Sequence, residues 1–244
     1  MTFGLLITYR VAMPIRDAFR YRLEIASVQP EGPHAVSVYV TGRQLERMPA
    51  QAGQFFRWRF LDRATWWEAH PFSLSAAPNG RFLRITAKGV GDHSRALHRV
   101  RPGTKVMAEG PYGKLTAGRR TKQRVLLIAG GVGITPLRAL VEEIRARPGD
   151  VTLLYRARRE SDLLFRSELE ELARRRGIDV RFLLGGRGGR NGPLSAHQLG
   201  RHVPDIAQRD VFLCGPPGMM DVAVQSLSAL GVPRAQIHRE RFEL

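Results

Sequence analysis

The spacing of hydrophobic residues changes character about halfway along the chain. In the first half, apolar residues alternate with polar ones, most clearly over residues 36–40 and 56–60. A period of two predicts antiparallel strands with one buried face. Proline and glycine separate several such stretches, which predicts a small barrel or sandwich, interrupted by one short helix over residues 94–99.

In the second half, short apolar runs alternate with helical patterns. The run over residues 125–129 is continuously apolar, as expected for a parallel strand that is covered on both faces. Further strands are expected at 151–155, 180–184 and 211–214, and helices at 163–175 and 222–230. This alternation predicts a doubly wound parallel sheet. A polar, basic stretch over 116–123 marks the break, which gives three segments: 1–22, 23–118 and 119–244.

A glycine-rich turn follows the run at 125–129. Gly130, Gly131 and Gly133 allow a tight turn and a close approach to a ligand. Thr135 is expected to cap the next helix and Pro136 to fill its first position, with Pro148-Gly149 as its end. The free amides of a helix N-terminus attract anions, so the turn indicates a site for a dinucleotide pyrophosphate. A plain connection between a strand and a helix is the alternative.

Composition narrows the classes of function. The 244 residues are 43% hydrophobic, enough for two modest cores, and no apolar run approaches the ~20 residues of a membrane span. A single cysteine, Cys214, excludes disulfides and an iron–sulfur cluster ligated by cysteines of this chain. The seven histidines show no metal-binding spacing, so no metal site is expected.

The net charge is +17, carried mainly by arginine, since only four of the 39 basic residues are lysine. The arginines are scattered along the chain without the clustering of a nucleic-acid interface, so no nucleic-acid function is expected. An acidic protein partner or an anionic membrane face fits this charge better. Segment 1–22 contains a single acid, Asp17, and four arginines, Arg10, Arg16, Arg20 and Arg22. This segment is either a juxtamembrane tail or an arm that is disordered or docks elsewhere.

Six motifs together give the chain a family resemblance. In order they are Ala52-Gly53-Gln54-Phe55, His70-Pro71-Phe72-Ser73-Leu74-Ser75, Gly91-Asp92-His93-Ser94, Gly110-Pro111-Tyr112-Gly113, Gly130 to Pro136, and Cys214-Gly215-Pro216-Pro217-Gly218-Met219. Over residues 23–244 the chain resembles the ferredoxin–NADP reductase superfamily. The resemblance implies a flavin-binding antiparallel β-barrel followed by a dinucleotide-binding domain with a doubly wound parallel sheet. The His-Pro-Phe-Ser sequence looks like the branch of ferric reductases and NADPH oxidases.

The resemblance also implies a flavin site, for FAD with FMN as the alternative. Phe72 matches the stacking aromatic, Ser73 the serine near flavin N5, and His70 the arginine that contacts the flavin phosphates. Because histidine is often neutral at pH 7, Arg57 or Arg95 is expected to help carry the charge. The complete expected set is His70, Pro71, Phe72, Ser73, Ser75, Thr86, Lys88, Gly91, His93, Ser94 and Phe242.

For the coenzyme, the resemblance implies NADPH, with NADH as the alternative. The residues after the second strand of the predicted sheet are arginines, which suit a 2′-phosphate better than a ribose hydroxyl. Cys214 is expected beside the nicotinamide C4, where with Ser73 it shapes hydride transfer without acting as a nucleophile. The complete expected set is Gly130, Gly131, Gly133, Thr135, Pro136, Arg156, Arg158, Arg187, Cys214, Gly215, Pro216 and Met219.

The expected activity follows from these sites. A hydride passes from NADPH to the flavin, and electrons then leave one at a time. The branch resemblance implies a haem-bearing membrane domain as acceptor and a location at the cytoplasmic face of the membrane. An NAD(P)H:ferredoxin or flavin reductase without a membrane partner, or a flavin electron-transfer subunit without its own turnover, are the alternatives.

Overall fold

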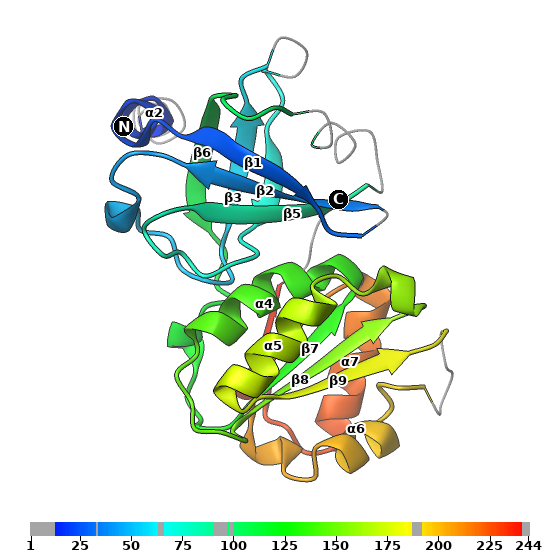
Figure 1. Ribbon diagram of the computed structural model, residues 1–244. Coiled ribbons are helices and arrows are strands. Elements are labelled where there is room, and N and C mark those ends of the chain that lie inside the picture. The colour runs from blue at the N-terminus through cyan, green and yellow to red at the C-terminus, as the bar shows by residue number, and fades with distance from the viewer. Residues whose placement is uncertain are drawn as a thin grey trace. The chain divides into compact units, whose positions relative to one another are not determined.

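A computed structural model describes residues 13–32, 34–62, 66–89, 97, 100–186 and 192–240, with side chains from Arg16 onward (Figure 1). The chain divides into two compact units, Met1–Gly113 and Lys114–Leu244. The three segments expected from the sequence stay a prediction, which limited proteolysis would test.

The first unit is built from two three-stranded antiparallel sheets. One has the order β1-β2-β5 and the other β4-β3-β6. Two isolated antiparallel bridges, Glu24 to Lys105 and Leu74 to Ile85, join their edges into a closed ring. The strands are β1 (Glu24–Pro30), β2 (Ala35–Thr41), β3 (Phe55–Phe60), β4 (His70–Ser73), β5 (Leu83–Lys88) and β6 (Val106–Tyr112).

Alternation along the strands fills the barrel. Phe56, Trp58 and Phe60 point inward and are at most 4% exposed, whereas Arg57 between them is exposed. Burying large aromatic side chains of this kind contributes roughly 1.5–3 kcal/mol each. Helix α2 (Met13–Tyr21) packs against β6, and its last residue, Tyr21, is buried. A 3₁₀ turn, η2 (Leu45–Arg47), follows β2.

The second unit is a five-stranded parallel sheet of order β11-β10-β7-β8-β9. Its strands are β7 (Val125–Gly130), β8 (Val151–Ala157), β9 (Asp179–Leu184), β10 (Asp210–Cys214) and β11 (Ile237–Glu240). The order reverses between β7 and β10, the place where ligands bind in open α/β sheets. The antiparallel barrel followed by a parallel sheet confirms the fold class predicted from the sequence.

Helices cover both faces of this sheet, as the doubly wound prediction requires. Figure 1 shows α4 (Ile134–Glu143) and α5 (Arg166–Arg176) over one face, with α6 (Ala196–His202) and α7 (Pro217–Ala229) over the other. Four 3₁₀ turns complete the loops beyond the glycine turn: η3 (Ala117–Arg119), η5 (Glu160–Asp162), η6 (Ile206–Gln208) and η7 (Arg234–Gln236). Within the described parts of the chain, no helix is long and apolar enough to cross a membrane.

Local expectations in this unit need four corrections. Thr135 does not cap α4, because the 3₁₀ turn η4 (Gly131–Gly133) runs straight into the helix and Thr135 Oγ1 donates to the Val132 carbonyl instead. For the same reason Pro136 is the third residue of α4 and not its first. The helix ends at Glu143, before the expected stop at 148–149. Helix α7 begins at Pro217, earlier than the apolar pattern indicates, since proline suits a first turn. In the first unit, the helix expected over 94–99 lies outside the described residues except for Leu97.

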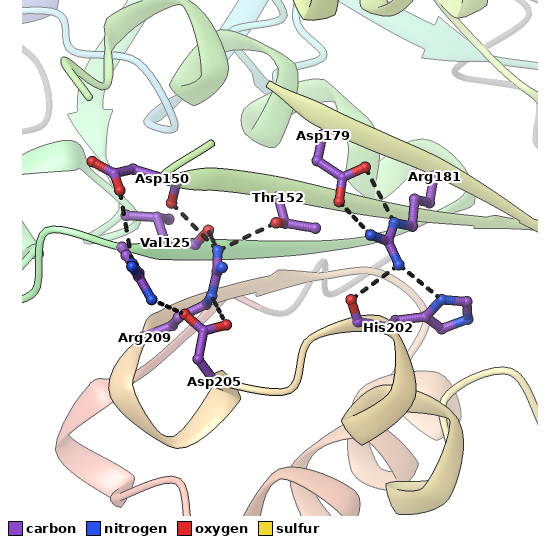
Figure 2. A network of polar contacts seen from close by, with 9 residues as sticks. Val125, Asp150, Thr152, Asp179, Arg181, His202, Asp205 and Arg209 are labelled. Atoms are coloured by element: carbon purple, nitrogen blue, oxygen red, sulfur yellow. Dashed lines mark hydrogen bonds and ion pairs between the residues drawn. The ribbon is translucent and has the colours of Figure 1, made fainter. Parts of the chain in front are cut away.

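A polar network holds the edge of the sheet opposite the carboxyl ends of its strands (Figure 2). The buried Arg209 donates to the carbonyls of Val125 and Asp150, to the Thr152 hydroxyl and to Asp205. Burial opposes ionisation of Asp205, but hydrogen bonds from Arg209 and Arg124 outweigh it and lower the pKa of this carboxyl. The network therefore joins strand ends to the η6 turn and leaves the carboxyl edge of the sheet for a ligand.

Candidate flavin and coenzyme sites

The glycine turn after β7 packs against the loop after β10, at the point where the strand order reverses. A Cβ on Gly133 would lie 2.3 Å from the Cys214 carbonyl oxygen, and one on Gly130 would lie 2.2 Å from Met219 Sδ. A Cβ on Gly215 would lie 3.1 Å from Gly130 Cα. Gly133 therefore stands where two backbones meet, Gly215 lies tightly against the Gly130 backbone, and Gly130 leaves room for the Met219 side chain. The sequence pattern alone does not reveal these contacts.

Gly131 differs from its neighbours. Its φ is +54° and nothing lies within 4 Å of a Cβ placed there, so its backbone borders open space. Tyr155 holds it in place, because the buried Tyr155 hydroxyl donates to the Gly131 carbonyl at 3.2 Å and accepts from the Leu164 amide at 3.1 Å. Burial raises the pKa of Tyr155 to about 12, which keeps the hydroxyl protonated for this bond. Sequence reasoning did not find Tyr155, since periodicity shows only that it is buried.

Cys214 and Glu240 lie side by side at the carboxyl ends of β10 and β11. Burial, with a smaller contribution from Glu240, raises the pKa of the Cys214 thiol, so the side chain stays neutral and is a poor nucleophile. Burial also raises the pKa of Glu240 to about 7, although the Leu115 amide donates to its carboxyl group. Glu240 Oε2 is buried without a hydrogen-bond partner among the described residues. Glu240 has no sequence signal beyond its place in the closing strand.

The remaining coenzyme residues lie around the same edge. Thr135, Pro136 and Met219 are buried, whereas Pro216 is exposed. Arg156 is the penultimate residue of β8 and donates to the Gly186 carbonyl at 2.7 Å. Arg158 follows the strand and is exposed. Arg187 lies outside the described residues.

Strand β4 carries the expected flavin motif. Ser73 pairs with Phe55 and Phe72 pairs with the buried Phe56, so the two predicted flavin residues lie on opposite faces of the strand. Phe72 is partly exposed and packs against the barrel core. Ser73, the last residue of β4, is only 5% exposed. Their flavin contacts stay a prediction.

An aromatic row lies on the outer face beside Ser73. Phe55 pairs with Ser73 on one side and Tyr112 on the other, and the rings of Phe55 and Tyr112 are 5.6 Å apart. Tyr112 is 36% exposed and Phe55 is partly exposed, so the row presents an accessible aromatic surface whose two rings are tilted by 38°. Both residues stand in motifs that carry the family resemblance, but their adjacency depends on strand register, which the sequence pattern does not specify.

Other predicted flavin residues are distributed differently. The buried Thr86 hydroxyl lies 2.8 Å from that of Ser75 and 2.7 Å from that of Ser37, so these side chains are held together, with Ser37 and Thr86 on the face of their strands opposite the barrel core. His70 Nε2 lies 3.1 Å from the Glu68 carboxylate, and Pro71 is exposed. Lys88 ends β5 and is partly exposed. Gly91, His93, Ser94, Arg95 and Phe242 lie outside the described residues.

These features fit the two cofactors that the resemblance implies. The Phe55–Tyr112 row offers an accessible aromatic surface, which suits a flat ring, and it lies beside the buried Ser73. The open backbone at Gly131 and the unpartnered oxygen of Glu240 border the carboxyl edge of the sheet, where a dinucleotide would lie. No group of three potential metal ligands occurs in the described parts of the chain.

Comparisons with known proteins identify two nucleotide-binding domains in the chain. Residues 21–116 match the family model of an FAD-binding domain, and residues 127–225 match that of an oxidoreductase NAD-binding domain. The chain is similar to ferredoxin–NADP reductase B of Sorangium cellulosum, with 34% identity over 193 residues, 70% of this chain and 77% of that protein. It is 32% identical to a flavohemoprotein of Vibrio cholerae over 184 residues, 72% of this chain and 46% of that protein.

A solved structure extends the similarity to the whole fold. The flavohem-like FAD/NAD-binding domain of nitric oxide dioxygenase from Vibrio cholerae superposes with a TM-score of 0.75 at 29% identity, covering 91% of this chain and 99% of that domain. Fold, sites and matches together define a flavoprotein oxidoreductase that uses a nicotinamide coenzyme. The chain belongs to the ferredoxin–NADP reductase family. It spans less than half of the flavohemoprotein, whose remaining part has no counterpart among the matched residues.

Proposed function

We propose that this protein oxidises NADPH at its second unit and passes electrons through FAD to a separate protein acceptor. The observation that carries the coenzyme proposal is the open Gly131 backbone, next to Gly130, whose partner on β8 is Arg156; the exposed Arg158 follows the end of that strand. No carboxylate occurs between residues 156 and 159 to bind a ribose 2′-hydroxyl, whereas guanidinium groups match a 2′-phosphate.

Each group at the carboxyl edge has a task in this proposal. The amides at the start of α4 and the Gly131 loop bind the diphosphate, while Arg158 and Arg187 bind the 2′-phosphate. Cys214 stays a thiol and limits how closely the nicotinamide packs. Glu240, whose pKa is about 7, holds or releases a proton beside that position. When bound, NADPH supplies a hydride and the flavin divides the electron pair into single electrons.

In the barrel, the proposed flavin contacts are those expected from the sequence, with two additions. Phe72 and Ser73 flank the ring where β4 ends, and the Phe55–Tyr112 row supplies its outer surface. His70, Lys88 and the Gly91–Ser94 segment carry the phosphate contacts in this proposal.

The acceptor that the relatives favour is a metal centre in another protein or domain. Similar proteins include a flavohemoprotein of Vibrio cholerae and the reductase component of propane 2-monooxygenase from Rhodococcus jostii. A haem-bearing membrane domain, as in ferric reductases and NADPH oxidases, is the second candidate, with the chain at the inner face of the membrane. The exposed arginines of α2, Arg16 and Arg20, favour it because cationic residues collect beside anionic leaflets.

The coenzyme proposal is tested by comparing kcat/KM for NADPH and NADH with ferricyanide as acceptor. The unmodified protein should prefer NADPH, and Arg158→Ala should narrow the preference by roughly tenfold or more, as expected for loss of a charge-assisted hydrogen bond. Arg175→Ala, which removes an exposed arginine near the far end of α5, is the matched control and should leave the preference unchanged. Equal efficiency with both coenzymes in the unmodified protein would refute the proposal.

A further inference from the structure

Two exposed tryptophans follow β3 and have no role in the sites described above. Trp66 and Trp67 are each 57% exposed, and their rings meet edge to face at 5.9 Å. Leu61, at the end of β3, is 41% exposed. The third tryptophan of the chain, Trp58, is completely buried in the barrel. Large apolar side chains exposed together on a surface indicate an interaction site.

Helix α2 exposes a second apolar side chain among charges. Phe19 is 73% exposed, and Arg16 and Arg20 are exposed on the same side of the helix, three residues before it and one after it. The opposite side carries Tyr21, which is buried against the barrel. The exposed face of α2 therefore combines an aromatic ring with two guanidinium groups, a combination that folding does not require.

The tryptophans and Phe19 lie at the same end of the barrel. The Leu61 amide donates to the Lys105 carbonyl, and the Val106 amide donates to the Leu23 carbonyl, two residues after α2. The end of β3, the start of β6 and the end of α2 are thus adjacent. Trp66 and Trp67 lie between the end of β3 and the start of β4, which pair with each other at Trp58 and His70. We call this surface the aromatic end, defined by Phe19, Leu61, Trp66 and Trp67.

The charge at the aromatic end is positive. The described cationic residues there are Arg16, Arg20, Arg22, Arg43 and Lys105, and the described acids are Asp17, Glu24, Asp62 and Glu68. Glu68, next to Trp67, is paired with His70. Asp17 and Glu24 are already paired, with Arg16 and Lys105 respectively. A partner that binds this surface therefore needs both negatively charged groups and an apolar region that accepts the aromatic side chains. An acidic protein surface offers the charge, whereas an anionic bilayer offers both features and accepts tryptophan rings at its interface.

We propose that the aromatic end docks this protein on an anionic lipid bilayer. Trp66, Trp67 and Phe19 enter the interface between headgroups and acyl chains, and Arg16 and Arg20 pair with lipid phosphates. The proposal deepens the second candidate above by assigning the surface that meets the membrane. It does not depend on the reductase chemistry, since docking needs neither coenzyme turnover nor a particular acceptor.

The test uses the full chain with its flavin and vesicles of phosphatidylcholine, alone or with an equimolar amount of phosphatidylglycerol. Tryptophan emission should shift to the blue only with the anionic vesicles, and because Trp58 is already buried, the shift reports on Trp66 and Trp67. Cosedimentation should fall by roughly tenfold or more in Trp66→Ser with Trp67→Ser. Arg16→Gln with Arg20→Gln should weaken it by about fivefold for each arginine, an effect that salt reproduces.

Matched controls separate docking from misfolding. Val222→Ser, at a 48% exposed position on α7, and Arg174→Gln with Arg175→Gln on α5 should bind vesicles like the unmodified chain. Flavin content and ferricyanide reduction by NADPH, measured without vesicles, should be unchanged in every variant. Failure of the unmodified protein to turn over NADPH would refute the proposed function without affecting the docking proposal. Absence of binding to anionic vesicles, or full binding by the folded double-tryptophan variant, would overturn the docking proposal.

Discussion

Glu240 is the parallel-strand partner of Cys214, although 26 positions separate them in the chain. The pair places a carboxyl group with a pKa of about 7 next to a thiol whose pKa burial has raised above its ordinary value. Both groups end their strands at the edge where the coenzyme is proposed to bind. Near neutral pH the thiol is uncharged while the carboxyl group titrates.

This titration predicts a pH-dependent stability. Because burial raises the pKa of Glu240 from 4.5 to about 7, the folded protein retains a proton that the unfolded chain releases, so stability is lost as pH rises between these values. Glu240→Gln removes the titrating group, and its Tm relative to the unmodified protein should rise between about pH 5 and about pH 8. The scale is roughly 2–4 °C for each kcal/mol in a protein of this size. A constant Tm difference across this range would contradict the assignment.

Tyr155→Phe should weaken coenzyme binding and stability together. The change leaves the Leu164 amide and the Gly131 carbonyl without their shared partner, at a cost of about 1–3 kcal/mol for the buried amide. KM for NADPH should increase more than kcat falls, because the loop is mispositioned while the reacting groups are intact. Tyr21→Phe, which removes a buried hydroxyl bonded to the Arg47 carbonyl in the first unit, is the control. It should lower Tm without changing KM, and equal KM effects of both variants would argue against a positioning role.

Substitution of Gly133 should be more harmful than substitution of Gly218. A Cβ on Gly133 would overlap the Cys214 carbonyl, so Gly133→Ala forces two backbones apart, at about 1–3 kcal/mol or more. Gly218 lies in the first turn of α7 with nothing within 4 Å of a Cβ, so Gly218→Ala should be neutral or slightly stabilising. Thermal unfolding compares them, and similar Tm values for the two variants would show that the loops separate at little cost.

The aromatic row predicts a measurable part of flavin affinity. Phe55→Leu with Tyr112→Leu should reduce the flavin retained after gel filtration, because the outer stacking surface is lost while the apolar volume is largely kept. Phe82→Leu, which removes a ring packed against Tyr39 in the same unit, is the matched control. Phe72→Leu in parallel shows how much of the affinity depends on the ring that faces the core. Full retention by the double variant would assign the flavin to another surface.

The features that were predicted correctly from the sequence depend on local patterns, whereas those that were missed depend on contacts between residues far apart in the chain. Alternation along a strand and continuous apolar runs are local signals, so the barrel, the parallel sheet and the Gly130–Gly133 turn were predictable. The Phe55–Tyr112 row and the pairing of Cys214 with Glu240 depend on register between strands, which no local pattern contains. The Thr135 cap was wrong because the rule considers only the residues that follow, whereas here the preceding 3₁₀ turn continues into the helix.

The contact between the two glycine loops also bears on how this enzyme is altered by design. A side chain on Gly133 would meet the backbone of Cys214, and one on Gly215 would press on the backbone of Gly130, so a change in one loop requires room in the other. A library of variants that changes only the turn after β7 would contain mostly proteins that fold poorly, since the loop after β10 limits the volume available to new side chains. Coenzyme preference is better reprogrammed from Arg156 and Arg158, which lie on a different strand end and can be exchanged without disturbing that contact.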